Sequence, residues 1–176
     1  MDALRRIARS SRRLGLVFRL GMWLTPVLVA TFWLWVGHNS VLQRQLPVPL
    51  DPDLPDWAKV WGFGVSMLPG AVVMYILALL GRLFRLYEQG QFFTSANVAI
   101  FQRLGWCILI WAASDFLRVA GLGIVLTLHR PAGQRLLVLS LGSDQILMAL
   151  IGLVVLTIAW VMDEARKIEE DRALII

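Results

Sequence analysis

Asp115 and Arg118 stand three residues apart near the middle of an apolar run, 104–128, that holds no other charge. Residues three apart share one face of a helix, so these two side chains can form an ion pair. At the centre of a bilayer an isolated Asp or Arg costs about 2.5–3.5 kcal/mol, and pairing lowers that cost. The pair is either a structural contact that orients one helix, or a proton, ion or substrate site.

Two prolines and three hydroxyl-bearing residues are expected at the depth of Asp115. A proline inside a helix removes one backbone hydrogen bond and leaves a carbonyl without its partner. With Asp115, these groups predict either a polar pocket at the membrane midplane, where transporters place their sites, or ordinary helix kinks. The five residues are Thr25, Pro26, Ser66, Pro69 and Ser114.

Small residues recur every four positions at Gly62, Ser66 and Gly70. This spacing places them on one helix face, and faces of small residues let two helices approach closely in a membrane. The stripe predicts a close helix contact, either within the chain or with a second copy in a homo-oligomer.

His38 and His129 each follow an apolar run on the same predicted side of the membrane. Two histidines from different helices can ligate one haem iron, and the simpler interpretation is two interfacial side chains. The sequence contains no Walker loop and no GxGxxG, HExxH, CxxC or GxSxG motif. We therefore expect no metal, no cofactor and no enzymatic activity.

The C-terminal tail, 163–176, alternates acidic and basic residues. At helical spacing Arg166 can pair with Glu169 and Glu170, and Lys167 with Glu164 and Asp171. The tail is either a solvated helix extension or a docking site for a protein partner.

These residues lie in a chain of 176 residues, 58% hydrophobic and 16% charged, with a mean hydropathy of +0.68. Ordinary soluble domains are about 25% charged, and a soluble monomer would here expose very large apolar patches. The composition excludes a soluble enzyme, a disordered chain and a collagen-like fibre. It indicates an all-α integral membrane protein.

A transmembrane helix needs about 20 predominantly apolar residues. Four such runs predict a single membrane domain over 1–176, with spans at about 14–36, 60–80, 104–128 and 145–162. The connecting loops are 37–59, 81–103 and 129–144. Four prolines between 47 and 55 predict an extended lid, and the weak alternation at 135–141 predicts a short strand or an extended arm.

The Lys and Arg residues are distributed unevenly between the two sides. The N-terminal segment, the loop 81–103 and the tail carry twelve of the 17 basic residues, whereas the other two loops carry four. Basic residues favour the cytoplasmic side, so both termini are predicted to be cytoplasmic and the loops 37–59 and 129–144 external. The basic residues flank the apolar runs, and the net charge of +5 therefore does not indicate nucleic-acid binding.

Three stretches resemble segments of the bacterial domain-of-unknown-function 2975 family. They are LFRLYEQGQFFT at 83–94, RPAG with LSLGSD within 130–144, and IAWVMDEARKIEED at 158–171. Their order and spacing extend the resemblance from about Leu20 to the end of the chain. The resemblance implies a four-helix protein of the inner membrane. Because members are often encoded beside a helix-turn-helix regulator, it also implies a regulatory role, and it carries over no catalytic residue.

We therefore expect a multi-pass four-helix bundle of the bacterial inner membrane, in contact with the lipid bilayer. Its expected role is that of a scaffold or signalling partner for another protein, without enzymatic activity. The alternative is a small proton-coupled transporter that acts as an oligomer, with Asp115 as the titrating group.

The charge asymmetry makes a direct prediction about topology. Reporter fusions after Leu46 and Gln134 should give an external signal, and fusions after Gln91 and Ile176 an internal one. An internal signal after Leu46 would contradict the predicted orientation.

Overall fold

The computed structural model describes the backbone of residues 2–51, 54–91, 94–131 and 133–173, and within it the side chains from Leu14 to Ile168 and that of Glu170. This part of the chain forms helices, turns and extended segments, without a β-strand. The helices are α1 (Asp2–Trp35), the 3-10 helix η1 (Val36–His38), α2 (Ser40–Gln43), α3 (Asp56–Glu88), α4 (Ser95–Thr127) and α5 (Ser143–Ala173).

Four helical segments are long and apolar enough to cross a membrane, which confirms the predicted all-α fold with four spans. The segments are Leu14–His38, Asp56–Glu88, Ser95–Thr127 and Ser143–Ile168. They are longer than the predicted spans, because hydrogen-bonded turns continue past the point where the first charges interrupt the apolar run.

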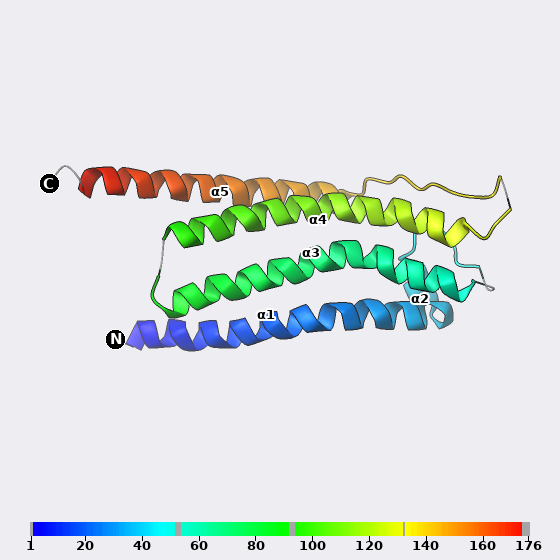
Figure 1. Ribbon diagram of the computed structural model, residues 1–176, viewed down its shortest axis with the longest axis horizontal. Helices are drawn as coiled ribbons and strands as arrows, with labels where there is room; N and C mark the ends of the chain where they lie inside the picture. Colours follow the sequence, from blue (N-terminus) through cyan, green and yellow to red (C-terminus); the bar gives the residue numbers. More distant parts are fainter. Residues whose placement is uncertain (1, 52–53, 92–93, 132, 174–176) are drawn as a thin grey trace.

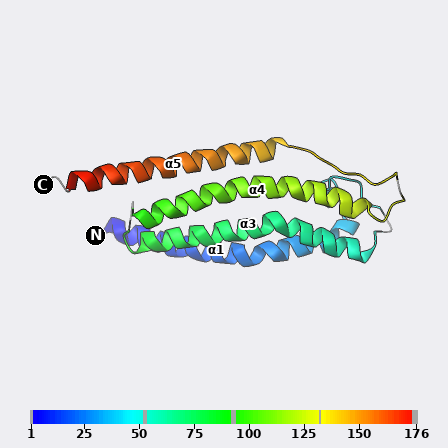
Figure 2. The ribbon, with the colours of Figure 1, turned by 45° about the horizontal axis from the view of Figure 1, so that its top comes forward.

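The four long helices form a row in which each packs on its neighbour in the chain. Helix α1 packs on α3, α3 on α4 and α4 on α5, and any further helix contact in the described part is marginal. Figure 1 shows α1 and α5 at the two edges of this row, and in Figure 2 α1 lies partly behind α3. Helix α1 begins and α5 ends at the same end of the molecule, here called the termini end. The opposite end is called the loop end.

Helix α5 is displaced along α4 toward the termini end. Two glycines show how α5 is aligned with α4. A Cβ added to Gly105 of α4 would touch Leu156, and a Cβ added to Gly152 of α5 would touch Leu109. Helix α5 therefore begins beside the middle of α4. Its last turns extend beyond the start of α4, as Figure 1 shows.

An extended arm, residues 134–142, covers the half of α4 that α5 leaves free. The Thr127 hydroxyl accepts a hydrogen bond from the backbone N–H of Leu136 at 3.0 Å. Gly123 leaves room for the arm, because a Cβ there would lie 3.0 Å from the backbone nitrogen of Val138. The arm is extended, one of the two conformations predicted for 135–141. Part of the predicted external loop thus lies alongside α4.

The proline-rich loop folds back onto the loop end of the helices. Val48 is 3% exposed and Leu54 8% exposed. Both belong to a core cluster with Trp33, Val36, Ala58, Leu122 and Leu126. The predicted lid is therefore anchored by apolar side chains between α1, α3 and α4.

Trp33 of α1 packs directly against Gly62 of α3. The Trp33 ring occupies the space that a side chain at residue 62 would need, and a Cβ on Gly62 would overlap it. The Trp33 indole N–H also donates a hydrogen bond to Ser66 Oγ at 3.1 Å. Ring and glycine together hold α1 against α3.

Gly62→Ala is expected to lower the free energy of unfolding by about 1–3 kcal/mol, because the added methyl group overlaps the buried Trp33 ring. Gly64→Ala is the matched control: a Cβ on Gly64 meets nothing within 4 Å. There the higher helix propensity of alanine should leave stability unchanged or raise it by up to about 1 kcal/mol. Thermal unfolding in detergent measures both variants, and equal effects would contradict the close contact.

Candidate functional site

Each of the two carboxylate oxygens of Asp115 accepts a hydrogen bond. The residue is 8% exposed. Its Oδ1 accepts a hydrogen bond from Arg118 Nε at 2.7 Å, which is the predicted pair within α4. Its Oδ2 accepts a hydrogen bond from Gln145 Nε2 at 2.6 Å, from the first turn of α5. The carboxylate thus joins two helices.

Gln145 is the residue of this site that the sequence analysis did not single out. Its Oε1 accepts a hydrogen bond from the backbone N–H of Gly142 at 2.8 Å, so one amide side chain links Asp115 to the end of the arm. The sequence signal was only an amide at the first position of the predicted span 145–162.

Asp115 lies near the middle of the apolar slab. Residues 60–81 of α3 are uncharged, and a helix of 22 residues rises about 33 Å, close to the ~30 Å of a hydrocarbon core. Pro69 and Gly70 stand near the midpoint of this run and line the same groove as Asp115. Asp115 therefore lies level with the middle of the uncharged run of α3, and its position at the membrane midplane stays a prediction.

The groove at this depth, here called the central groove, has a volume of about 430 Å³. Its walls come from α1, α3 and α4 and from Gln45 in the loop after α2, with Phe32 and Trp111 among the apolar side chains. Four of the predicted site residues line it: Ser66, Pro69, Asp115 and Arg118. The groove is therefore an apolar space with one ion pair in its wall.

Thr25, Pro26 and Ser114 do not line the central groove. Two of them bond within their own helices: Thr25 Oγ1 donates to the Gly21 carbonyl at 2.9 Å, and Ser114 Oγ to the Trp111 carbonyl at 2.8 Å. Pro26 and Pro69 both lie inside helices, α1 and α3 respectively. Of the residues predicted to form a polar pocket with Asp115, only Ser66 and Pro69 therefore line the groove.

The stripe of Gly62, Ser66 and Gly70 faces α1 of the same chain. Trp33 contacts the first two residues, and a Cβ on Gly70 would lie 3.7 Å from Thr25 Cγ2. Of the two predicted partners, a helix of the chain and a second copy, the stripe therefore contacts the first.

A second charged cluster lies at the loop end. Arg130 donates from Nε to Asp51 Oδ2 at 2.8 Å and from Nη2 to Asp51 Oδ1 at 2.9 Å. His129 Nε2 lies 2.9 Å from Asp51 Oδ2. The hydrogen bond from Arg130 is the main reason why the pKa of Asp51 is lowered. The cluster fastens the proline-rich loop to the end of α4.

The contact with Asp51 gives His129 a different partner from the one that haem ligation requires. His38 lies exposed in η1. In the part of the chain that the structure describes, no group of three or more His, Cys, Asp or Glu side chains is placed to hold a metal ion.

Ion pairs run along the end of α5. Arg166 pairs with Glu170, as predicted, and also with Asp163 at 3.3 Å. Lys167 pairs with Asp163 at 2.9 Å and more distantly with Glu164 at 3.7 Å. The side chains of Glu169 and Asp171, also predicted to pair, lie outside the described residues.

The fold and the buried pair define a multi-pass helical membrane protein with four apolar helices. A family model described as "Protein of unknown function (DUF2975)" matches residues 42–176. The chain therefore belongs to this family, as the resemblance indicated. The match begins at residue 42, not near Leu20, and so includes α3, α4 and α5 but not α1. No curated protein and no solved structure was found to match the chain.

The hydrogen bonds of Asp115 predict how its variants behave. Asp115→Ala should lower the free energy of unfolding by about 3–5 kcal/mol, because it leaves Arg118 without its counter-charge in the slab. Asp115→Leu combined with Arg118→Leu should cost less than Asp115→Ala, because no unpaired charge remains and only the hydrogen bond from Gln145 is lost. Gln145→Leu should cost about 1–3 kcal/mol through the loss of a donor to a charged acceptor.

A double-mutant cycle on thermal unfolding in detergent measures these effects. Gln134→Leu, in the exposed part of the arm, serves as the control for the loss of a glutamine. A double variant as unstable as Asp115→Ala would contradict a purely structural ion pair.

Proposed function

We propose that the chain is a non-enzymatic protein of the bacterial inner membrane that acts as a scaffold or signalling partner for another protein. The proposed contact surface is the charged end of α5, on the cytoplasmic side according to the predicted topology. A regulatory role is also what the family resemblance implies.

The observation that carries this proposal is the projection of α5 beyond the helix row. The register of α5 on α4 leaves its last turns without a neighbouring helix, and Figure 2 shows them extending away from α4. A single helical turn in water has little stability of its own. The ion pairs of Arg166 and Lys167 at i, i+3 and i, i+4 support the helix here. A preformed helix with charges of both signs is suited to bind a protein surface.

The proton-coupled transporter remains the second candidate, because Asp115 and Arg118 line the central groove. A proton cycle would require Asp115 to release Arg118 or Gln145 during each turnover. Both carboxylate oxygens accept short hydrogen bonds, which favours the structural role.

Two variants separate these candidates in a strain that lacks the gene, with the transcript profile of that strain as the readout. A chain that ends after Met162 keeps the apolar part of α5 and loses the charged end. It should fail to restore the wild-type profile if the end of α5 binds the partner. Asp115→Asn, combined with Arg118→Gln so that no unpaired charge remains, keeps the charged end and should restore the profile.

Immunoblots of the membrane fraction must show both variants at the wild-type amount. The reverse result, with restoration by the shortened chain and not by Asp115→Asn combined with Arg118→Gln, would overturn the proposal and favour the transporter. Restoration by both variants would contradict both candidates.

A further inference from the structure

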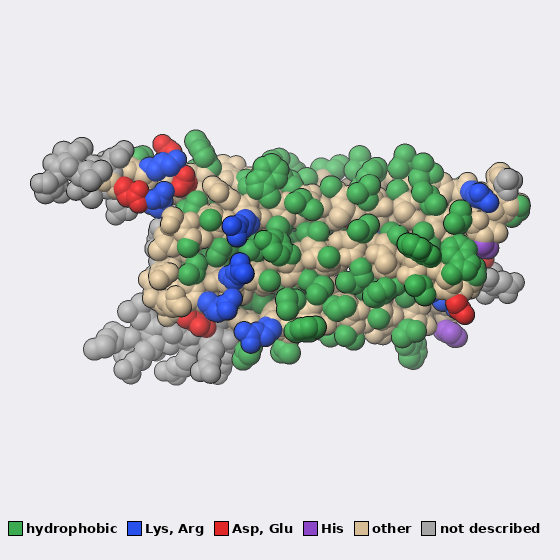
Figure 3. Space-filling view, viewed as in Figure 1, with side chains coloured by type: hydrophobic (Ala, Val, Ile, Leu, Met, Phe, Trp, Pro, Cys, Tyr) green, Lys and Arg blue, Asp and Glu red, His purple; other side chains and the backbone are tan. Residues whose placement is uncertain are grey.

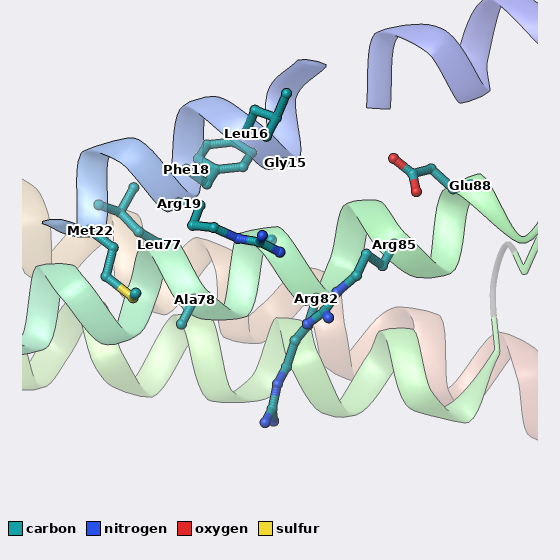
Figure 4. Close-up of a pocket in the computed structure, with 11 residues that line it drawn as sticks. Gly15, Leu16, Phe18, Arg19, Met22, Leu77, Ala78, Arg82, Arg85 and Glu88 are labelled. Carbon is teal, nitrogen blue, oxygen red and sulfur yellow. The ribbon is translucent and has the colours of Figure 1, made fainter. Parts of the chain in front are cut away.

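A second groove lies between α1 and α3 at the termini end and is here called the arginine groove. Its volume is about 450 Å³. One part of its wall is apolar, with Phe18, Met22 and Leu77. The other part carries three arginines and one glutamate: Arg19, Arg82, Arg85 and Glu88. Figure 4 shows Arg19 extending from α1 toward α3, Arg85 running along α3 toward Arg82, and Arg82 pointing away from α1.

None of the three arginines forms an ion pair with a side chain that the structure describes, although Glu88 lines the same groove. Arg19, Arg82 and Arg85 form neither a salt bridge nor a hydrogen bond within that part of the chain. Arg82 and Arg85 lie three positions apart on α3, a spacing at which like charges repel each other. An anion in the groove would relieve this repulsion and use guanidinium donors that are otherwise free.

The arginines lie at the depth of the lipid headgroups. Arg82 directly follows the uncharged run 60–81, whose length matches the hydrocarbon core. Figure 3 shows Lys and Arg side chains in a band across the helices, between the apolar middle and the termini end. The apolar wall of the groove therefore borders the acyl chains, and the guanidinium groups border the phosphates.

We propose that the arginine groove binds one anionic phospholipid. Arg19 and Arg85 hold its phosphate from two helices, and an acyl chain lies against Phe18, Met22 and Leu77. A guanidinium group presents paired N–H donors that match two phosphate oxygens, and three arginines against one glutamate leave the wall positively charged. Basic pockets between transmembrane helices are a known way to bind such headgroups. The lipid links α1 to α3 at the termini end, where no ion pair joins them in the described part.

The test uses the full chain in nanodiscs of phosphatidylcholine with and without phosphatidylglycerol. Native mass spectrometry should detect one retained phosphatidylglycerol per chain, and this lipid should raise the unfolding temperature. Arg19→Gln combined with Arg85→Gln should weaken retention by at least about tenfold, because each charge-assisted hydrogen bond contributes more than a neutral one. In pure phosphatidylcholine the double variant should unfold more like the wild type, because the choline cation beside the phosphate leaves that headgroup without net negative charge.

Arg103→Gln is the matched control. It removes the same charge beside Leu104, which shares a core cluster with Leu83 and so lies at the same depth, but it does not line the groove. Arg103→Gln should leave retention unchanged. An equal loss with Arg103→Gln would show unspecific attraction to the bilayer and overturn the proposal.

Inorganic phosphate, added to the chain in detergent, distinguishes a free anion from a lipid. It should not reproduce the rise in unfolding temperature, because it makes no contact with the apolar wall. An equal rise with inorganic phosphate would overturn the lipid proposal in favour of a free-phosphate site. If the double variant does not fold, the single variant Arg85→Gln is tested with the same expected direction, and unchanged retention would again overturn the proposal.

Discussion

A carboxylate in the hydrocarbon core has to be satisfied by donors, and in this protein that requirement joins α4 to α5. Asp115 takes one donor from its own helix and one from Gln145. Because Gln145 lies in the first turn of α5, the contact places the start of α5 beside the middle of α4. Close packing at Gly105 and Gly152 holds the same register. The displacement leaves half of α4 to be covered by the arm and lets the end of α5 project at the termini end.

The two ends of the helix row differ in whether their charged side chains form ion pairs within the chain. At the loop end, Asp51 lies against both His129 and Arg130, and its lowered pKa reflects the hydrogen bond from Arg130. At the termini end, Arg19, Arg82 and Arg85 line one groove, and none of them forms an ion pair within the described part of the chain. The loop end is therefore fastened by the chain itself, whereas the arginine groove is open to an anion from outside the chain.

Sequence reasoning reached the spans and the ion pair because both depend on local pattern. Apolar runs of sufficient length define the spans, and the i, i+3 spacing of Asp115 and Arg118 holds wherever that segment is helical. Sequence reasoning did not identify Gln145, Trp33 or the arginine groove. Asp115 and Gln145 are 30 residues apart and Trp33 and Ser66 are 33 apart. No local period connects such pairs. The predicted polar pocket forms only in part, because the hydroxyl groups of Thr25 and Ser114 donate to backbone carbonyls of their own helices.

The amino-acid sequence by itself determined the class of protein, the number of spans and the family, since these follow from hydropathy, length and short motifs. It also determined that Asp115 and Arg118 would pair, because helix geometry brings them together. Only the tertiary structure decided which helices are neighbours, how far α5 is displaced on α4 and which arginines share a groove. These outcomes depend on where side chains of different helices meet, at Gly62 with Trp33 and at Gly105 with Leu156. Contacts of this kind depend on how the helices pack against one another. The spacing of residues within one segment does not specify that packing.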